Sequence, residues 1–485
     1  MENRRQFLKA VGAGAVALVV GSGAEAKPPA RRPNFVFFLI DDLGWSDIGC
    51  YGNKFNETPN IDRLAAQGMR FTDAYAACPV CSPTRASIVS GQYPARAGII
   101  DFIPGHWRPF EKLTVPINRQ QYLPLKSVTF AESLKGAGYA CGAFGKWHLG
   151  GKGRLPDAQG FDTMMIAGGG RHFGNRTTPN MKLTKDDYLA EAITARSVKF
   201  LEANKDRPFF LYVMHYAVHI PLEARKKLIA KYEKKAKPPT GVNNPTYAAM
   251  VEHVDDSVGS ILDKLDELKL ADNTVVVFFS DNGGLRQHYR KIGPVVTTNA
   301  PLRDEKGTLY EGGIREPLIV RRPGKVKAGA VCDEVVTSVD FYPTFLDIAG
   351  VKRPVDHVLD GESITPLLDR SGKLARDAVY WHYPVYHHST PAGAIRRGHW
   401  KLIEFFDTGP SRFELYNLKD DIGESNDLAA RMPGRVKELQ KRLSEWRKSV
   451  NARLPKKNPN YDPAKSDQWG RHPGSNRRRK GKRAK

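Results

Sequence analysis

The chain has 485 residues, of which 41% are hydrophobic, enough for a large core in two or three domains or in one large α/β unit with an appendage. Its formal net charge of +23 predicts attraction to anions such as polyanionic glycans, nucleic acid or acidic surfaces. Five cysteines are an odd number and too few for a disulfide scaffold. No nucleic-acid-binding motif accompanies the basic run at residues 477–485, so we expect a flexible tail there and no nucleic-acid partner.

The N-terminus has the pattern of an export signal. Arg4 and Arg5 precede an apolar stretch over residues 10–20, and Ala24-Glu25-Ala26 offers a cleavage site. The stretch is too short and too rich in glycine for a stable membrane span. We expect a twin-arginine signal peptide over residues 1–26, recognised by the twin-arginine export machinery. The mature chain is then periplasmic or secreted, without a membrane span; an uncleaved anchor is the alternative.

Four apolar runs share one property, which is that each ends in polar side chains. They are rich in β-branched and aromatic residues, as expected for strands buried on both faces of a parallel sheet. The runs cover residues 34–40, 139–145, 208–214 and 274–280. Directly after them come Asp41-Asp42, Lys146-Trp147-His148, His215 with His219, and Asp281-Asn282.

Helical patterns alternate with these runs, at residues 129–135 and 247–268. This alternation predicts an α/β fold with a large, mostly parallel sheet sandwiched by helices. In such sheets the ligand crevice lies outside the carboxyl ends of the strands. The four sets of polar side chains should therefore meet at one edge of the sheet.

The pattern of predicted secondary structure changes past residue 370. Short antiparallel strands are predicted at residues 378–381, 394–403 and 413–418, followed by an amphipathic helix that carries Val436, Leu439, Leu443 and Trp446. We therefore divide the mature chain into a catalytic domain over residues 33–370 and a smaller α+β subdomain over 371–453. The remainder, 454–485, is rich in Pro, Lys, Asn and Arg and is predicted to be a loose basic tail.

The strand-end carboxylates predict a metal site. Asp41, Asp42, Asp281 and Asn282 offer only oxygen ligands, which suit a hard cation, Ca²⁺ before Mg²⁺. An isolated Asp-Asp pair is more often a turn or a helix cap, but a second acidic strand end favours the metal.

The cations nearby predict an anionic substrate. Arg85, Lys146 and Lys306 are candidate anion holders, and His148 and His219 are candidate proton carriers. With a divalent metal, and against three aspartates, this set leaves about two positive charges, which suits an anionic ester. In an extended segment, Lys146 and His148 would face the same side.

Cys81 lies at the start of a predicted helix, with Pro83 in the first turn. A helix N-terminus lowers the pKa of a neighbouring thiol. From these residues alone, Cys81 could be a thiolate nucleophile, a metal ligand or an inert side chain.

The run Cys81-Ser82-Pro83-Thr84-Arg85 resembles the maturation signature of sulfatases, in which the cysteine is oxidised to formylglycine. Further segments similar to this family occur in order between about residues 33 and 428. They lie at 41–44, 58–62, 145–150, 280–284 and 306–317. The chain is thus identified as similar to the formylglycine-dependent (type I) sulfatases, of the arylsulfatase and N-acetylgalactosamine-sulfatase kind. It is expected to share their alkaline-phosphatase-like fold.

The resemblance also implies roles for single residues. Calcium would be bound by Asp41, Asp42, Asp281, Asn282 and the modified Cys81, and a formylglycine-generating enzyme would be needed for maturation. Arg85 would steady the aldehyde hydrate, and Lys146 and Lys306 would hold the sulfate. His219 would protonate the leaving alcohol, and His148 would act as base when the second hydroxyl of the hydrate expels sulfate. His215 fits the family pattern less well than His219.

The resemblance further implies hydrolysis of sulfate monoesters, with sulfated carbohydrates as the expected substrates. The leaving-group pocket is predicted at residues 106–108, 171–172, 288 and 386–388, with His106, Arg171, His172, His288, His387 and His388 as candidate contacts. Two alternatives stay open. One is a phosphonate monoester or phosphodiester hydrolase of the same superfamily, and the other is a non-catalytic protein that binds sulfated glycans.

Overall fold

The computed structural model describes residues 32–288, 293–406, 409–470 and 473. The predicted signal peptide and the basic run at 477–485 lie outside these residues. The described residues from 33 onward cluster as one unit, which contains both the predicted catalytic domain and the predicted subdomain. None of the described helices combines the length and the apolarity needed to cross a membrane.

A ten-stranded sheet organises the fold, in the order β10-β2-β9-β8-β1-β7-β4-β5-β6, with β11 beside β2. The four strands predicted from the sequence are central neighbours in this sheet: β8 (Thr274–Ser280), β1 (Asn34–Ile40), β7 (Phe209–Met214) and β4 (Ala140–Gly145). They run parallel to one another. The sheet is mixed because β9 (Arg315–Arg321) pairs antiparallel with β8 and with β2 (Met69–Tyr75). Its other strands are β5 (Thr163–Ala167), β6 (Thr177–Thr178), β10 (Ala330–Cys332) and β11 (Val336–Thr337).

Both faces of the sheet are covered, which explains why the central strands are apolar at every position. All seven residues of β1 are buried, and its side chains alternate between two cores. Phe35, Phe37 and Leu39 belong to the core under α2 (Cys81–Ser90), α4 (Phe130–Gly136), α9 (Phe341–Ala349) and α10 (Thr365–Leu368). Val36, Phe38 and Ile40 belong to the core under α1 (Pro59–Gln67), α5 (Leu189–Asn204), α6 (Lys226–Lys234) and α7 (Pro245–Glu267).

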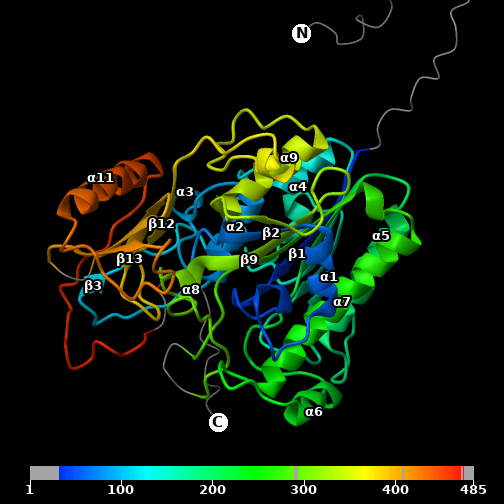
Figure 1. Ribbon diagram of the computed structural model, residues 1–485, viewed down its shortest axis with the longest axis horizontal. Helices are drawn as coiled ribbons and strands as arrows, with labels where there is room; N and C mark the ends of the chain where they lie inside the picture. The colour runs from blue at the N-terminus through cyan, green and yellow to red at the C-terminus, as the bar shows by residue number, and fades with distance from the viewer. Residues whose placement is uncertain (1–31, 289–292, 407–408, 471–472, 474–485) are drawn as a thin grey trace, which may run out of the picture. The chain divides into compact units, whose positions relative to one another are not determined.

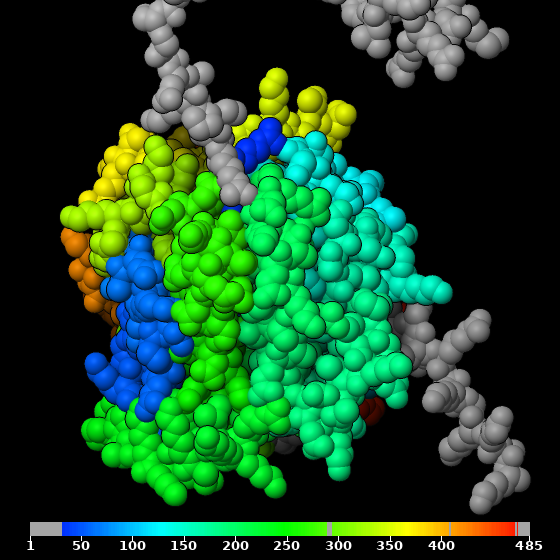
Figure 2. All heavy atoms as spheres, turned by 90° about the vertical axis from the view of Figure 1, so that its right-hand side faces the viewer, coloured from blue at the N-terminus to red at the C-terminus, as the bar shows by residue number. Residues whose placement is uncertain are grey.

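The two helical layers can be followed in the figures. Figure 1 shows α2, α4 and α9 together on one side of the sheet, with α1, α5 and α7 on the other. Figure 2 looks onto the second layer, where the blue segment that includes α1 lies beside the green segments of α5 to α7. The predicted α/β sandwich is therefore confirmed.

The C-terminal part forms a four-stranded antiparallel sheet of β12 (Ala378–Tyr383), β13 (Ala392–Arg397), β14 (Trp400–Phe405) and β15 (Arg412–Asn417). Residues 394–403, predicted as one strand, are two strands joined at Gly398, whose φ of 57° is in the left-handed region. One face of this sheet packs on α11 (Pro433–Ser449), and the other faces the main body. Lys401 ties the sheet to α8 (Glu311–Ile314), because its Nζ lies 2.8 Å from the buried carboxylates of Glu311 and Glu424.

The segment predicted as a tail from residue 454 is packed as far as residue 470. Lys456–Lys457 (β16) pairs antiparallel with Leu113–Thr114 (β3). Asn458 is buried, and its side-chain amide donates hydrogen bonds to the carbonyls of Pro109 and Glu111. This packing could not be predicted from the sequence, because the segment is held through backbone groups and one asparagine and has no apolar stripe of its own.

The remaining helix, α3 (Pro94–Ala97), lies after α2 in the chain.

Candidate active site

Two strand ends bring four oxygen-bearing side chains together. β1 and β8 are parallel, with Ile40 opposite Ser280, so the residues after both strands emerge at the same edge. The backbone N–H of Asp42 donates to Asp281 Oδ1 at 3.3 Å, and Asn282 Nδ2 donates to Asp42 Oδ1 at 2.8 Å. Asp41, Asp42, Asp281 and Asn282 are all at most 1% exposed. The structure thus brings the four predicted oxygen ligands together at one edge of the sheet.

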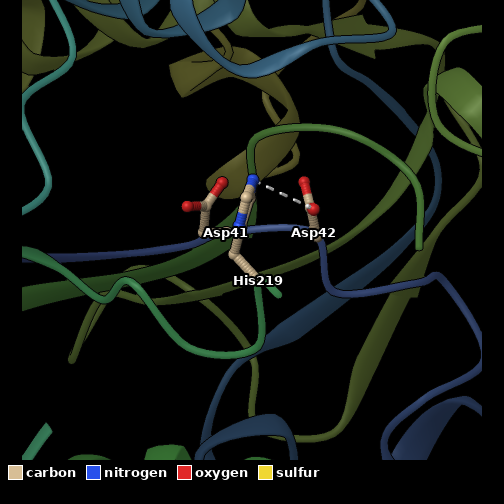
Figure 3. A group of neighbouring side chains, drawn as sticks. All are labelled: Asp41, Asp42 and His219. Atoms are coloured by element: carbon tan, nitrogen blue, oxygen red, sulfur yellow. Dashed lines mark ion pairs between the residues drawn. The ribbon is translucent and has the colours of Figure 1, made fainter. Parts of the chain in front are cut away.

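Several of these buried oxygens lack a hydrogen-bond donor. Asp41 Oδ1, Asp42 Oδ2 and Asn282 Oδ1 accept no hydrogen bond. Buried acceptors are rarely left in this state, because the desolvation cost is not offset. Asp41 and Asp42 also place a carboxylate oxygen each within 4.8 Å of one another and of a ring nitrogen of His219. Figure 3 shows the imidazole of His219 between the two carboxylates. The oxygen donor set fits a hard cation.

Three buried cations surround the carboxylates. Arg85 Nε donates to Asp281 Oδ2 at 2.7 Å, Lys146 Nζ bonds Asp41 Oδ2, and Lys306 Nζ lies 2.5 Å from Asp42 Oδ1. Burial alone would raise the pKa of Asp41, but the charges of Lys146, Arg85 and Lys306 outweigh it and hold this pKa far below its usual range. Burial would lower the pKa of Lys306, but the negative charge of Asp42 outweighs burial and raises this pKa. Asp41 and Asp42 are therefore charged together with the cations, whereas burial raises the pKa of Asp281 well above its usual value although the charge of Arg85 opposes it.

Cys81 is the first residue of α2 and is 2% exposed. Its Sγ lies 3.2 Å from His148 Nδ1, while His148 Nε2 lies 2.7 Å from the carbonyl oxygen of Ile103. Because a carbonyl can only accept, Nε2 carries the proton and Nδ1 is left as an acceptor facing Cys81. Burial, assisted by Lys146, lowers the pKa of His148 to about 3, so the ring is neutral at pH 7.

The backbone at His148 differs from the prediction. Its φ is 57°, so residues 146–148 are not an extended segment. Lys146 and His148 nevertheless line the same cavity. Ser82, which the sequence did not single out, fixes this turn: its hydroxyl donates to the carbonyl of His148 at 2.9 Å and accepts the N–H of Ile103 at 3.1 Å. Its position inside the Cys81–Arg85 signature was the available signal.

The two histidines after β7 have different environments. His219 Nδ1 lies 2.6 Å from the carbonyl of Ile220, and its Nε2 lies 3.7 Å from Asp42 Oδ2. Burial lowers the pKa of His219 to about 4. His215, directly after β7, is fully buried, does not line the cavity at this edge and bonds Ser257 Oγ at 2.9 Å. Tyr216, between them, places its ring 5.4 Å from Lys146 Nζ, a contact that the sequence pattern did not indicate.

A cavity of about 990 Å³ opens onto this edge. The predicted catalytic residues Cys81, Lys146, His148, His219 and Lys306 line it, whereas Arg85 is buried beneath them. Of the predicted leaving-group contacts, His106, His288 and His387 also line it.

The other three predicted contacts lie outside the lining. Arg171 is exposed. His172 is 1% exposed, and its Nε2 lies 2.8 Å from the carbonyl of His219, so it supports that residue from behind. His388 lies behind His387, with their Nδ1 atoms 2.8 Å apart.

Comparison with known proteins shows the family to which the chain belongs. The family model described as Sulfatase matches residues 33–351, and the model described as N-sulphoglucosamine sulphohydrolase, C-terminal, matches residues 304–450. The chain belongs to the sulfatase family. A Sulfatase of Formosa agariphila is 32% identical, and the alignment covers 90% of this chain and 92% of that protein.

Two solved structures share the fold of this chain. Ps i-CgsB in complex with k-i-k-neocarrahexaose superposes with a TM-score of 0.72 at 30% identity, covering 86% of this chain and 93% of that one. A second relative, solved in complex with its substrate D-glucosamine-2-N,6-O-disulfate, has a TM-score of 0.68 at 25% identity and covers 87% and 98% of the two chains. This sulfatase is accordingly a sulfuric ester hydrolase.

Proposed function

We propose that this sulfatase hydrolyses sulfate monoesters of carbohydrates, using a formylglycine made from Cys81 and a bound Ca²⁺. The supporting observation is the convergence, at one cavity, of Cys81, a neutral His148 and two lysines held by buried carboxylates. A sulfate ester is a compact anion, and this site offers fixed positive charge to it at low solvent exposure.

Calcium would be held by Asp41, Asp42, Asp281 and Asn282, together with the modified residue 81. The three buried acceptor oxygens that lack donors are the reason to expect a cation there. When bound there, calcium would supply Lewis-acid activation of the ester.

The chain's own residues then have separate tasks. Lys146 and Lys306 hold the sulfate by charge, with Asp41 and Asp42 keeping both amines protonated. His148 Nδ1 faces position 81 as an acceptor, which suits a base that takes a proton from that residue. His219 presents Nε2 at the same edge, and an anionic substrate beside it favours the imidazolium that can protonate the leaving alkoxide. A formylglycine at position 81 supplies the nucleophilic oxygen that cysteine lacks.

Carbohydrate is the proposed leaving group because the relatives are solved with saccharides and because the cavity exceeds the size of one sulfate. His106, His288 and His387 line it and offer hydrogen-bonding edges to sugar hydroxyls.

Two measurements test the proposal. Mass spectrometry of the Cys81 peptide from the native host is expected to show formylglycine. Sulfate release from sulfated saccharides is expected to exceed hydrolysis of phosphodiesters and phosphonate monoesters; a preference for the diester would establish the alternative enzyme. Intact cysteine together with no hydrolysis would instead favour the glycan-binding protein.

We also propose that residues 1–26 direct twin-arginine export. In a bacterial host, the mature protein is expected in the periplasm or medium with a new N-terminus at Lys27. Replacing Arg4 and Arg5 by Lys should retain the protein inside the cell. Unchanged export of that variant would contradict the proposal.

A further inference from the structure

The packed C-terminal segment, residues 456–470, forms an outer layer over residues 106–114. Backbone hydrogen bonds join the two along their length: Asn458 to Lys112 at 2.9 Å, Asp462 to Phe110 at 3.1 Å and Gly470 to Trp107 at 2.8 Å. A segment held by several backbone hydrogen bonds is an ordered part of the domain and not a loose tail.

Arg108 clamps the end of this segment. Its Nε and Nη2 donate to the carbonyl of Ser466 at 2.9 and 2.6 Å, and Nη2 pairs with Glu111 at 2.8 Å. The guanidinium also lies 5.3 Å from the ring centre of Tyr386 and 5.4 Å from that of Trp469. Cation–π contacts of this kind orient both rings around one charge.

Trp469 reaches the cavity through His106. The two rings meet edge to face, with centroids 4.7 Å apart, and on its other sides His106 contacts Phe102 and His387, each with a centroid separation of 4.5 Å. Phe102, His106 and His387 all line the cavity that contains Cys81 and Lys306, whereas Trp469 stands behind them, half-buried. Removing the indole would leave the imidazole of His106 without its outer support.

We propose that Trp469 is a positioning residue for specificity: it holds His106 in the orientation that contacts the hydroxyls of the carbohydrate to which the sulfate is attached. This rests on the proposed function, because a sulfate ester without a saccharide has nothing to bond there. The sulfate itself is held by Lys146 and Lys306, whose amines are fixed by Asp41 and Asp42. Loss of Trp469 should therefore affect the saccharide and spare the sulfate.

The test compares kcat and KM on two substrates, D-glucosamine-2-N,6-O-disulfate or a sulfated carra-oligosaccharide as the carbohydrate and 4-nitrophenyl sulfate as the small ester. For Trp469→Ala we expect KM for the sulfated saccharide to rise about tenfold with kcat within about twofold, and both constants for the aryl ester to stay within about twofold. Trp469→Phe, which keeps a ring edge, should recover most of the loss. His106→Ala should reproduce the Trp469→Ala effect, and the double variant should add little to it, as expected for two residues in one contact.

Tyr461→Ala is the matched control, since Tyr461 is an exposed aromatic residue (44%) on the same segment. Equal losses of Trp469→Ala on both substrates, no loss at all, or the same loss in Tyr461→Ala would overturn the inference. If the unmutated enzyme turns over the aryl ester but no sulfated saccharide, the carbohydrate part of the proposed function fails and this inference with it. If the unmutated enzyme turns over the sulfated saccharide but the variants affect the saccharide and the aryl ester alike, this inference alone fails.

Discussion

Arg85 and Asp281 form a buried ion pair in which Nε and Oδ2 are 2.7 Å apart and neither side chain is more than 1% exposed. The pair joins the first turns of α2 to the end of β8, so the segment that carries Cys81 is tied directly to a proposed calcium ligand. The Nη1 of Arg85 also donates to the carbonyl of Lys146 at 2.5 Å. One guanidinium therefore connects three of the segments that build the site.

Breaking this pair should destabilise the fold. Replacing Arg85 by Leu leaves Asp281 buried without its partner, which costs about 3–5 kcal/mol of unfolding free energy by analogy with other buried pairs. Denaturant unfolding of the unmodified protein measures it. Arg63→Leu is the control, because Arg63 and Asp263 form a similar 2.7 Å pair at the surface, worth about 0–1 kcal/mol. Similar losses in both variants would contradict the assigned role of the buried pair.

Calcium should stabilise the protein without any turnover. At a concentration of about one hundred times Kd the gain is about 2.7 kcal/mol, seen as a higher Tm that chelation reverses. Asn282→Ala removes one oxygen ligand and should weaken calcium binding in calorimetry. Asn204→Ala, which loses a buried amide that bonds the carbonyl of Phe200 in α5, should keep the full calcium shift. A Tm indifferent to calcium would exclude the proposed site.

His172 should affect kcat more than KM, because its ring supports the carbonyl of His219 and does not line the cavity. For His172→Ala we expect kcat to fall about five- to tenfold, the size expected when one neutral hydrogen bond is lost. His172→Gln, which keeps a donor, should recover part of it. Arg171→Ala, at the exposed neighbouring position, should change neither constant much. A rise in KM alone for His172→Ala would instead support the direct substrate contact that the sequence predicts.

The stability of the C-terminal sheet should fall in mild acid. His382 is 4% exposed, its Nε2 bonds the carbonyl of Arg453 at 2.9 Å, and its Nδ1 has no partner. Burial lowers the pKa of His382 from 6.5 to about 4. The folded protein thus binds this proton more weakly than the unfolded chain does, so the contribution of His382 is complete above pH 6.5. This contribution is lost as pH falls from 6.5 towards 4, which lowers the free energy of unfolding by at most about 3 kcal/mol.

Urea unfolding at pH 7.5 and 4.5 measures this term when the protein is compared with His382→Gln, which keeps the donor to Arg453 but cannot titrate. The variant should lose less stability than the unmutated protein between the two pH values. An equal loss in both would show that other groups carry the acid sensitivity.

Much of this fold was predictable, because a strand buried on both faces has to be apolar throughout. Residues 34–40 and 274–280 were therefore found with their exact bounds, and the polar residues after them could be assigned to one edge. The positions of His172 and His388 could not be predicted, since spacing does not say whether a histidine points into a cavity or behind another residue. The packed segment 456–470 was missed because its order comes from backbone hydrogen bonds, which leave no apolar periodicity in the sequence.

Every residue of α2 is buried, from Cys81 to Ser90. Small molecules can reach Cys81 through the cavity. A second protein cannot bind the peptide around Cys81 once α2 is packed against the sheet and α9. Any enzyme that modifies this cysteine must therefore act on the unfolded or growing chain. The fraction of active molecules would then be fixed before folding is complete, and later exposure to that enzyme could not raise it.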